Sequence, residues 1–189
     1  TTQIGSKMNN KGVLVANEVD YKRLGPLKIN LERSGLTNAV ITNMDGRNIE
    51  GENLYDRVLL DAPCSGSGVI RKSPGTIKTY NPKKLKGMQN LQLKLLQRAF
   101  DLLRVGGIMT YSTCSLDPEE NEFTVKKFLD NNSNAELMDC KLKGLVLNNK
   151  LDEFLGVKIP EEIKNKTIRI WPQDNDTNGF FVAKFKKLG

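Results

Sequence analysis

Two cysteines that each follow a short apolar segment are the residues of this sequence best suited to covalent chemistry. Cys64 comes after the apolar residues 58–60 and an acid, Asp61, and Cys114 comes after residues 108–111, 50 positions beyond Cys64. A thiolate is a strong nucleophile, but a thiol with an ordinary pKa of about 8.5 is only a few per cent ionised at neutral pH. The reactive cysteine therefore needs a positive environment or a nearby helix N-terminus.

The residues after Cys114 predict such a helix N-terminus. Asp117 lies three positions after the cysteine and is a natural N-cap, because its side chain can accept a hydrogen bond from the first turn. We therefore expect a helix that starts at Asp117 and runs to about Leu129. Glu119 and Glu120 fall in its first turn, so we expect them to have structural roles.

The composition excludes several kinds of site. The sequence has no histidine, and its third cysteine, Cys140, is expected to pack as a small apolar residue. Neither an imidazole base nor a four-ligand Cys/His zinc site can therefore be assembled. Any chemistry must come from thiols, carboxylates or a cofactor. A cytosolic redox pair is the alternative interpretation of the other two thiols.

The net charge of +7 is unevenly distributed. Residues 71–87 contain no acid and six cations, which are Arg71, Lys72, Lys78, Lys83, Lys84 and Lys86. A solvated basic loop is one interpretation of this segment. Because this segment directly follows the Cys64 loop, we favour the interpretation that it forms a phosphate-binding surface beside the site of that cysteine.

Alternating apolar strands and amphipathic helices predict a doubly wound α/β sheet, mostly parallel, with helices on both faces. Strands are expected at residues 12–16, 39–42, 58–60, 108–111, 135–138 and 179–185, the last covered on both faces. Helices are expected at residues 1–8, from Asp20, at 83–104 and at 117–129. The second of these either begins near Gly25 or kinks at Pro26. The remainder of residues 131–166 is expected to be irregular.

The helical crossover between residues 58–60 and 108–111 makes these strands parallel, so both thiols should open into one crevice. Three acids, Glu18, Asp45 and Asp61, end three successive strands at the edge where ligands of such sheets bind. A ribose-binding acid follows a glycine-rich turn by about 20 residues, yet no G-x-G pattern precedes Glu18. We therefore expect the first strand and its glycine loop to be absent from this chain.

The length of 189 residues suits one domain, so residues 1–189 are expected to form a single, partial catalytic domain. The sequence contains no apolar run of transmembrane length and no signal-peptide pattern. These features predict a soluble intracellular chain.

Four longer phrases carry a family resemblance: TTQI, DAPCSGSGVIRK, LQLKLLQRAFDLLRVGGIMTYSTCSLDPEENE and RIWPQDNDTNGFFVAKF. On these phrases the chain resembles the Sun family of RNA (cytosine-5) methyltransferases over nearly its whole length. The resemblance implies a Rossmann-like fold, S-adenosyl-L-methionine as cofactor and tRNA or rRNA as partner. It implies no role for a membrane or a metal, and a cytoplasmic location, or a nucleolar or nuclear one in a eukaryote.

The resemblance also implies roles for individual residues. Cys114 would be the nucleophile, Cys64 would assist product release, and Lys72 is a candidate contact to RNA. The cofactor-side residues that it implies are Glu18 at the ribose hydroxyls, Asp45 near the adenine, Asp61 near the methionine end and the target base, and Arg23 in the same pocket as Glu18.

The implied reaction needs covalent catalysis, because carbon 5 of cytosine is a poor nucleophile. A thiolate that adds at carbon 6 converts the ring into an enamine, whose carbon 5 attacks an electrophilic methyl group. Carbon 5 must then lose a proton before the enzyme is released, and a second thiol can assist this step directly or through water. Ahead of the TTQI phrase, family members carry a strand, a glycine loop with a lysine and an RNA-binding module. We therefore expect this chain alone to be inactive in methyl transfer.

Two other functions remain open at this point. A non-catalytic RNA-binding or ribosome-assembly protein could retain the same fold, and the missing glycine loop motivates that alternative. A nucleotide-binding thiol oxidoreductase is the third hypothesis, but the absent glycine fingerprint leaves it unsupported.

Overall fold

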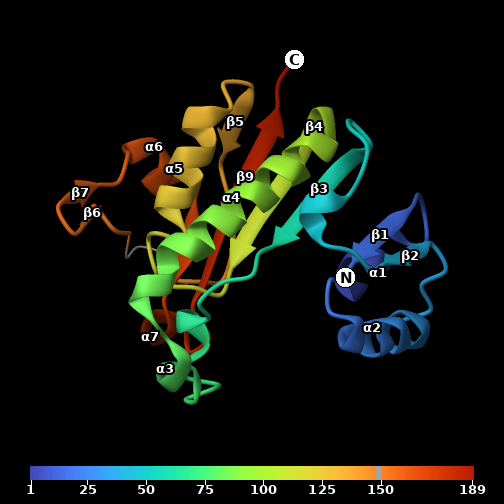
Figure 1. Ribbon diagram of the computed structural model, residues 1–189, viewed down its shortest axis with the longest axis horizontal. Helices are drawn as coiled ribbons and strands as arrows, with labels where there is room; N and C mark the ends of the chain where they lie inside the picture. Colours follow the sequence, from blue (N-terminus) through green and yellow to red (C-terminus); the bar gives the residue numbers. More distant parts are fainter. Residues whose placement is uncertain (148–149) are drawn as a thin grey trace. The chain divides into compact units, whose positions relative to one another are not determined.

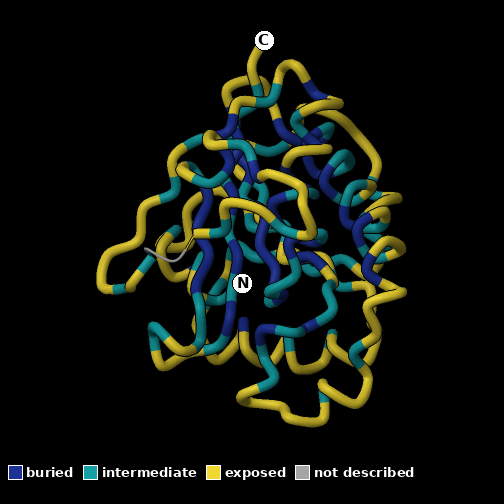
Figure 2. The backbone as a smooth tube through the Cα atoms, turned by 90° about the vertical axis from the view of Figure 1, so that its left-hand side faces the viewer, coloured by how far each residue is buried: buried dark blue, intermediate teal, exposed yellow. Residues whose placement is uncertain are grey.

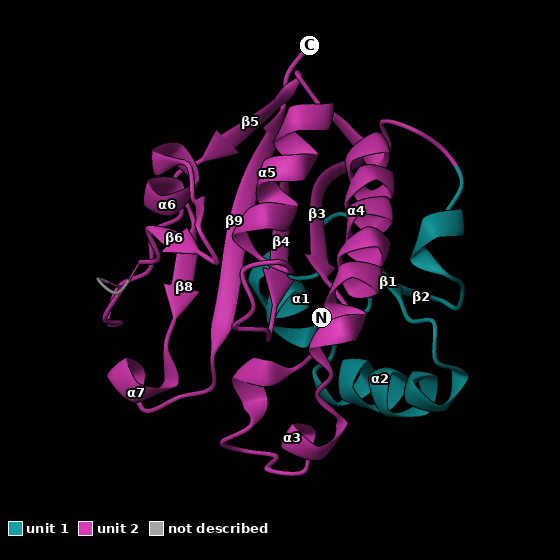
Figure 3. Ribbon diagram, turned by 60° about the vertical axis from the view of Figure 1, so that its left-hand side comes forward, with its two compact units in different colours: residues 1–50 teal, residues 51–189 magenta. Residues whose placement is uncertain are grey.

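The computed structural model describes residues 1–147 and 150–189, which form two compact units, residues 1–50 and 51–189 (Figure 3). Residues 148–149, part of the segment predicted to be irregular, lie outside the described residues. Among the described residues, no helix combines the length and the apolar character that crossing a membrane requires.

The first unit contains two parallel strands and two helices. Helix α1 (Thr2–Met8) is followed by β1 (Leu14–Asn17), α2 (Tyr21–Arg33), β2 (Ala39–Thr42) and the 3-10 turn η1 (Gly46–Asn48). Strands β1 and β2 pair in parallel, with Asn17 opposite Thr42, so their carboxyl ends lie at the same edge.

Helix α2 begins where the sequence predicts a cap. The Asp20 carboxylate accepts a hydrogen bond of 2.9 Å from the Lys22 N–H, which satisfies a donor of the first helical turn. The helix continues through Pro26 to Arg33. The alternative in which it begins near Gly25 is therefore wrong.

The second unit is built on a mixed sheet with the strand order β3-β4-β9-β5 (Figure 1). Strand β8 also pairs with β9. Strand β3 is parallel to β4, whereas β9 is antiparallel to β4, β5 and β8. The strands of this unit are β3 (Tyr55–Asp61), β4 (Leu103–Thr113), β5 (Ala135–Met138), β6 (Glu153–Phe154), β7 (Val157–Lys158), β8 (Ile168–Ile170) and β9 (Phe180–Lys187). The prediction of a mostly parallel sheet thus holds for β1–β2 and β3–β4, and not for β9.

The helices of this unit vary widely in length. They are η2 (Ser67–Val69), α3 (Thr76–Thr79), η3 (Pro82–Lys84), α4 (Leu85–Leu102), α5 (Glu122–Asn131), α6 (Glu161–Lys166) and α7 (Pro172–Asn175). Helices α4 and α5 lie against the same face of the sheet (Figures 1 and 3). The long helix expected at residues 83–104 and the strand expected at residues 135–138 are confirmed.

The core of this unit lies between those two helices and the sheet, where buried residues are dark blue in Figure 2. Phe128 of α5 is 1% exposed and makes edge-to-face contacts with Phe100 of α4 and Phe185 of β9, with ring centroids 5.3 and 5.0 Å apart. In β9, alternate residues are buried and their neighbours only partly so. The expected cover is therefore complete on one face of this strand and partial on the other.

Leu59 of β3 is 51% exposed, although it lies in an apolar run. Residues 131–166 contain β6, β7 and α6 besides β5, so they are more regular than their composition indicates.

Helix α5 begins at Glu122, five residues later than expected. The backbone from Asp117 to Asn121 instead forms turns, in which the N–H groups of Glu120 and Asn121 donate to the carbonyls of Asp117 and Pro118. Asn121 has φ −111° and ψ −100°, which is outside the helical region, so the helix cannot extend back through it.

Candidate functional site

The two sulfur atoms of Cys64 and Cys114 lie 3.0 Å apart, within hydrogen-bond contact. Cys114 directly follows β4 and Cys64 lies three residues beyond the end of β3, and these two parallel strands place Asp61 opposite Ser112. The ladder continues beyond the strands, since the Ala62 N–H donates to the Ser112 carbonyl at 2.9 Å. The prediction that both thiols meet at one edge of the sheet is therefore confirmed.

The contact makes the two thiols unequal acids. A hydrogen bond from the Cys64 S–H lowers the pKa of Cys114 to about 7, despite opposing burial. The same hydrogen bond, together with burial, raises the pKa of Cys64 well above its ordinary value. Cys114 therefore ionises first, and its acidity comes from the second thiol rather than from a helix N-terminus at Asp117, where no helix begins.

Two buried side chains hold the backbone on either side of Cys64. Glu120 is 0% exposed and accepts hydrogen bonds from the Ser65 N–H and the Gln92 side-chain amide, each 2.9 Å long. The same Gln92 amide donates to the Pro63 carbonyl at 2.9 Å. The structural role expected for Glu120 is thus to fix the loop that carries the second thiol.

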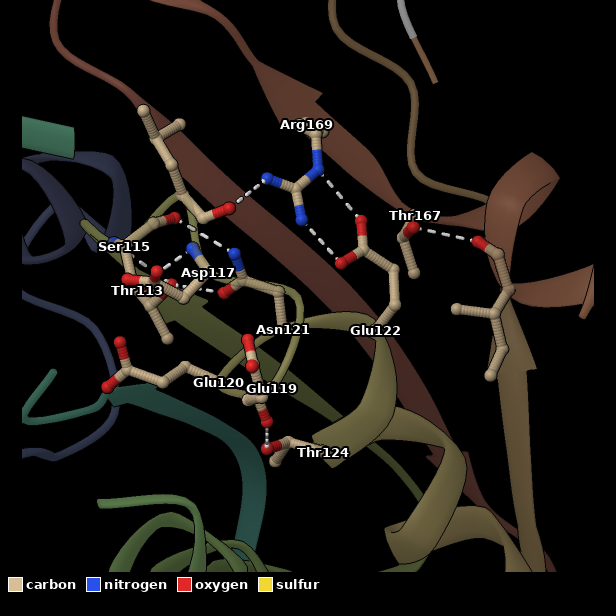
Figure 4. A network of polar contacts seen from close by, with 12 residues as sticks. Thr113, Ser115, Asp117, Glu119, Glu120, Asn121, Glu122, Thr124, Thr167 and Arg169 are labelled. Atoms are coloured by element: carbon tan, nitrogen blue, oxygen red, sulfur yellow. Dashed lines mark hydrogen bonds and ion pairs between the residues drawn. The ribbon is translucent and has the colours of Figure 1, made fainter. Parts of the chain in front are cut away.

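A second set of contacts holds the backbone around Cys114 (Figure 4). The buried Asn121 amide accepts a hydrogen bond of 2.6 Å from the Thr113 hydroxyl and donates one of 2.9 Å to the Ser115 carbonyl. The residues on both sides of Cys114 are thereby tied to the start of α5.

Strand β8 reaches the same loop through a buried ion pair, also drawn in Figure 4. The Arg169 guanidinium pairs with the Glu122 carboxylate through two nitrogens, and both side chains are about 95% or more buried. Its remaining nitrogen donates to the Leu116 carbonyl at 2.8 Å. The ion pair therefore links β8, the first residue of α5 and the Cys114 loop.

Three loops converge at Gly68. Its N–H donates to the Cys114 carbonyl at 2.9 Å, and its own carbonyl accepts from the Gly179 N–H at 2.8 Å. A Cβ atom at Gly68 would lie 2.6 Å from the Gly179 carbonyl oxygen and 2.7 Å from that of Cys114. Only glycine allows this approach, which ties the segment before β9 to both cysteine loops.

The candidate cofactor-side acids are divided between the two units. Asp61 ends β3 and accepts a hydrogen bond of 3.1 Å from the Ser112 hydroxyl, which places it at the edge that carries the thiols. Glu18 and Asp45 follow the carboxyl ends of β1 and β2 in the first unit. It stays a prediction that Glu18, Asp45 and Asp61 bind one and the same ligand.

Both acids of the first unit have partners of their own. Glu18 accepts from the Asp20 N–H at 3.0 Å and pairs with Arg23 at 3.2 Å, so Arg23 does lie beside Glu18. Hydrogen bonds from the side chain and backbone of Arg47 lower the pKa of Asp45 to about 2. Each of these carboxylates therefore accepts hydrogen bonds and has an adjacent cation.

Lys72 is exposed and lines an open cavity of about 290 Å³ together with Arg71, Asp176, Thr177 and Asn178. Arg71 forms an ion pair with Asp176, whereas the Lys72 ammonium has no ion-pair or hydrogen-bond partner among the contacts of the described residues. No group of three or more cysteine or acidic residues in the described part of the chain could hold a metal ion.

The model of the family described as 16S rRNA methyltransferase RsmB/F matches residues 1–186. The chain belongs to this family. The Sun-family resemblance of its motifs is thereby confirmed, and the match includes both strands that end at the thiols as well as the acids of the first unit.

Curated relatives agree with this family assignment. The chain is 42% identical over 188 residues to a tRNA (cytosine(49)-C(5))-methyltransferase of Pyrococcus abyssi, an alignment that covers 99% of the chain and 60% of the relative. It is 39% identical over 190 residues to ribosomal RNA small subunit methyltransferase F of Vibrio cholerae, over 100% of the chain and 38% of the relative. The chain thus spans 38–60% of the length of these relatives.

Solved structures show the same fold. A methyltransferase homolog from Pyrococcus horikoshii matches with a TM-score of 0.80 and 37% identity, over 98% of this chain and 56% of that one. NSun6 from the same organism, solved with SFG, matches with a TM-score of 0.81 and 30% identity, over 100% of this chain and 44% of that one. The predicted Rossmann-like methyltransferase fold is confirmed.

Sequence reasoning missed several residues of this RsmB/F site. Gln92 lies on the core face of the helix α4, between apolar positions, and is 0% exposed. A polar residue at an apolar helical position was the available signal that it binds something buried. Asn121 and Arg169 gave no such signal, because their partners depend on the tertiary fold.

Proposed function

We propose that this chain is the catalytic part of an RNA (cytosine-5) methyltransferase, with Cys114 as the nucleophile and Cys64 as the residue that assists release. The observation that carries the proposal is the contact of 3.0 Å between two thiols at the ends of adjacent parallel strands. A family of structural RNA-binding proteins would have no need of a second thiol that acidifies the first. Membership of the RsmB/F family supports the same reaction.

In the proposed reaction, the Cys114 thiolate adds to carbon 6 of the target cytosine, which makes carbon 5 nucleophilic. Its pKa of about 7 gives a substantial thiolate fraction at neutral pH. Asp61 lies at the same strand edge and is proposed to contact the target base. Once carbon 5 carries the new methyl group, Cys64 loses its own proton to water and its thiolate takes up the proton of carbon 5, directly or through water. The electrons of the broken C–H bond re-form the double bond between carbons 5 and 6 and release Cys114 as a thiolate.

S-adenosyl-L-methionine is the proposed cofactor, and it supplies the electrophilic methyl group. The donor set of the first unit fits such a ligand, because the carboxylates of Glu18 and Asp45 follow adjacent parallel strands and can accept hydrogen bonds. We propose that Glu18 binds the ribose hydroxyls, that Asp45 lies near the adenine, and that Arg23 orients Glu18. We propose that Asp61 lies near the methionine end, and that residues 1–189 belong to one partial catalytic domain.

The proposed macromolecular substrate is tRNA or rRNA, the two classes named for the relatives. Lys72 and the other exposed cations of residues 71–87 follow the Cys64 loop and would bind the phosphates near the target base. Such a substrate places the protein in the cytoplasm, or in the nucleus or nucleolus of a eukaryote.

Labelled methyl transfer by the full-length protein tests the proposal. Cys114→Ala should abolish both methyl transfer and any denaturation-resistant adduct with RNA. Cys64→Ala should form that adduct and accumulate it, because addition survives while release slows. Cys140→Ala serves as the matched control and should leave both measurements unchanged. Adduct formation by Cys114→Ala, or none by Cys64→Ala, would contradict these roles.

A further inference from the structure

Asp117 lies at the centre of a cluster of four hydroxyl groups. Its Oδ2 atom accepts hydrogen bonds from the hydroxyls of Ser65, Ser67 and Ser115, at 2.9, 2.7 and 3.0 Å. Its Oδ1 atom accepts one of 2.6 Å from the Tyr80 hydroxyl. Although burial opposes it, these hydrogen bonds lower the pKa of Asp117, so its carboxylate is charged at neutral pH.

The donors come from both cysteine loops. Ser65 is the residue directly after Cys64, and Ser115 is the residue directly after Cys114. One carboxylate oxygen therefore binds the neighbour of each thiol. Hydrogen bonds to a charged acceptor are stronger than those between neutral groups, so this oxygen is well suited to fix the spacing of the two loops.

The cluster also organises the backbone between the loops. The Ser67 hydroxyl accepts from the Leu116 N–H at 2.9 Å, and the Ser115 hydroxyl accepts from the Asp117 N–H at 3.0 Å. Each of these serines thus donates to the Asp117 carboxylate and accepts from the chain of the Cys114 loop. Asp117 was expected to be the N-cap of a helix, but α5 begins at Glu122 with Asn121 at its N-cap position. The Asp117 side chain binds this hydroxyl cluster instead.

We propose that Asp117 is a positioning residue that holds the two thiols in contact and thereby sets the reactivity of Cys114. The inference rests on the proposed function, because it names what controls the nucleophile of that reaction. Tyr80 lies within the basic segment at residues 71–87, and its hydroxyl donates to the Asp117 carboxylate. Asp117 therefore also holds this basic segment beside the two cysteine loops.

The test measures how the rate of Cys114 alkylation by iodoacetamide depends on pH, followed by mass spectrometry of the peptide that contains it. In Asp117→Ala, the pKa of Cys114 should rise from about 7 toward the ordinary value of about 8.5, because Cys64 is no longer held against it. Tyr80→Phe should produce a smaller rise. Asp56→Asn removes an exposed carboxylate at the other end of β3 and should produce none.

Kinetics of the full-length protein provide the second readout. Asp117→Ala should lower kcat for methyl transfer at pH 7 by up to about 3-fold, with KM for RNA changed less than about 2-fold, and higher pH should partly restore the rate. A structural defect alone would not produce this pH dependence. If Asp117→Ala does not fold, the double variant Ser65→Ala/Ser115→Ala removes two donors and leaves the carboxylate in place.

An unchanged pKa of Cys114 in folded Asp117→Ala, or in the double variant, would overturn the inference. The spacing of the thiols would then be set by backbone contacts such as that between Gly68 and Cys114. Alkylation requires neither RNA nor cofactor. Failure of the proposed function, seen as absent methyl transfer by the wild type, is therefore distinguishable from failure of the positioning role.

Discussion

Removal of the Cys64 thiol should change the reactivity of Cys114 in opposite directions at low and high pH. In the wild type, a pKa of about 7 makes Cys114 about half ionised at pH 7. In Cys64→Ala the lost hydrogen bond should return the pKa toward about 8.5, at which only about 3% of the thiol is ionised at pH 7. The thiolate fraction therefore falls roughly 16-fold.

The rate changes less than the thiolate fraction, because a more basic thiolate is a better nucleophile. With a Brønsted coefficient of about 0.45, an increase of about 1.5 in pKa raises intrinsic reactivity about 5-fold. Alkylation of Cys114 in Cys64→Ala should then be about 3-fold slower than in the wild type at pH 7, and about 5-fold faster at pH 10. The two rate profiles should cross near pH 8.

The assay follows iodoacetamide modification of the Cys114 peptide by mass spectrometry between pH 6 and pH 10, in a Cys140→Ser background that removes the third thiol. Cys64→Ser, whose hydroxyl can still donate a hydrogen bond, should give an intermediate profile. Coincident profiles for the wild type and Cys64→Ala would refute the reasoning, because they would show that Cys64 does not control the acidity of Cys114.

Three further predictions concern stability, measured by urea denaturation. Arg169→Met leaves Glu122 buried without its partner and should lower the free energy of unfolding by about 3–5 kcal/mol. Gly68→Ala places a Cβ atom 2.6 Å from the Gly179 carbonyl oxygen, so it should destabilise the protein and abolish the RNA adduct in the full-length protein. Phe128→Ala removes a ring that is 1% exposed and should cost about 3–5 kcal/mol.

Matched controls exist for each of these changes. Arg104→Met removes an exposed partner of Asp56 and should cost less than about 1 kcal/mol. Gly87 lies in α4 with no atom within 4 Å of its Cβ position, so Gly87→Ala should be neutral or stabilising. Leu59→Ala should cost less than Phe128→Ala, because Leu59 is 51% exposed. Equal losses for a variant and its control would contradict the stated reason.

The meeting of the two thiols was predictable because it depends on local patterns. Apolar residues at helical spacing predict the crossover helix α4, and one helical crossover between two apolar strands makes those strands parallel neighbours. The thiols of Cys64 and Cys114 follow the ends of such strands, so their proximity comes from the order of elements alone.

The role of Asp117 was not predictable, because its partners are distant along the chain. Its nearest sequence context indicates an N-cap, but Ser65 and Tyr80 lie 52 and 37 positions away and bind its carboxylate. An aspartate side chain such as that of Asp117 can accept hydrogen bonds from nearby backbone N–H groups or from residues distant in the sequence. The sequence alone does not show which of these donors it binds. The direction of β9 could not be predicted either, because an apolar run does not show whether its strand is parallel or antiparallel to its neighbours.

The order in which the two thiols act follows from their contact. While Cys114 is a thiolate, their hydrogen bond raises the pKa of Cys64, which keeps its proton. In the proposed reaction, Cys114 loses its charge when it bonds to carbon 6, and the largest cause of the raised pKa of Cys64 then disappears. Cys64 is then a stronger acid than before, so it can release its proton to water and, as a thiolate, accept the proton that carbon 5 loses. A chain without histidine can therefore obtain a nucleophile and a base in turn from one pair of sulfur atoms.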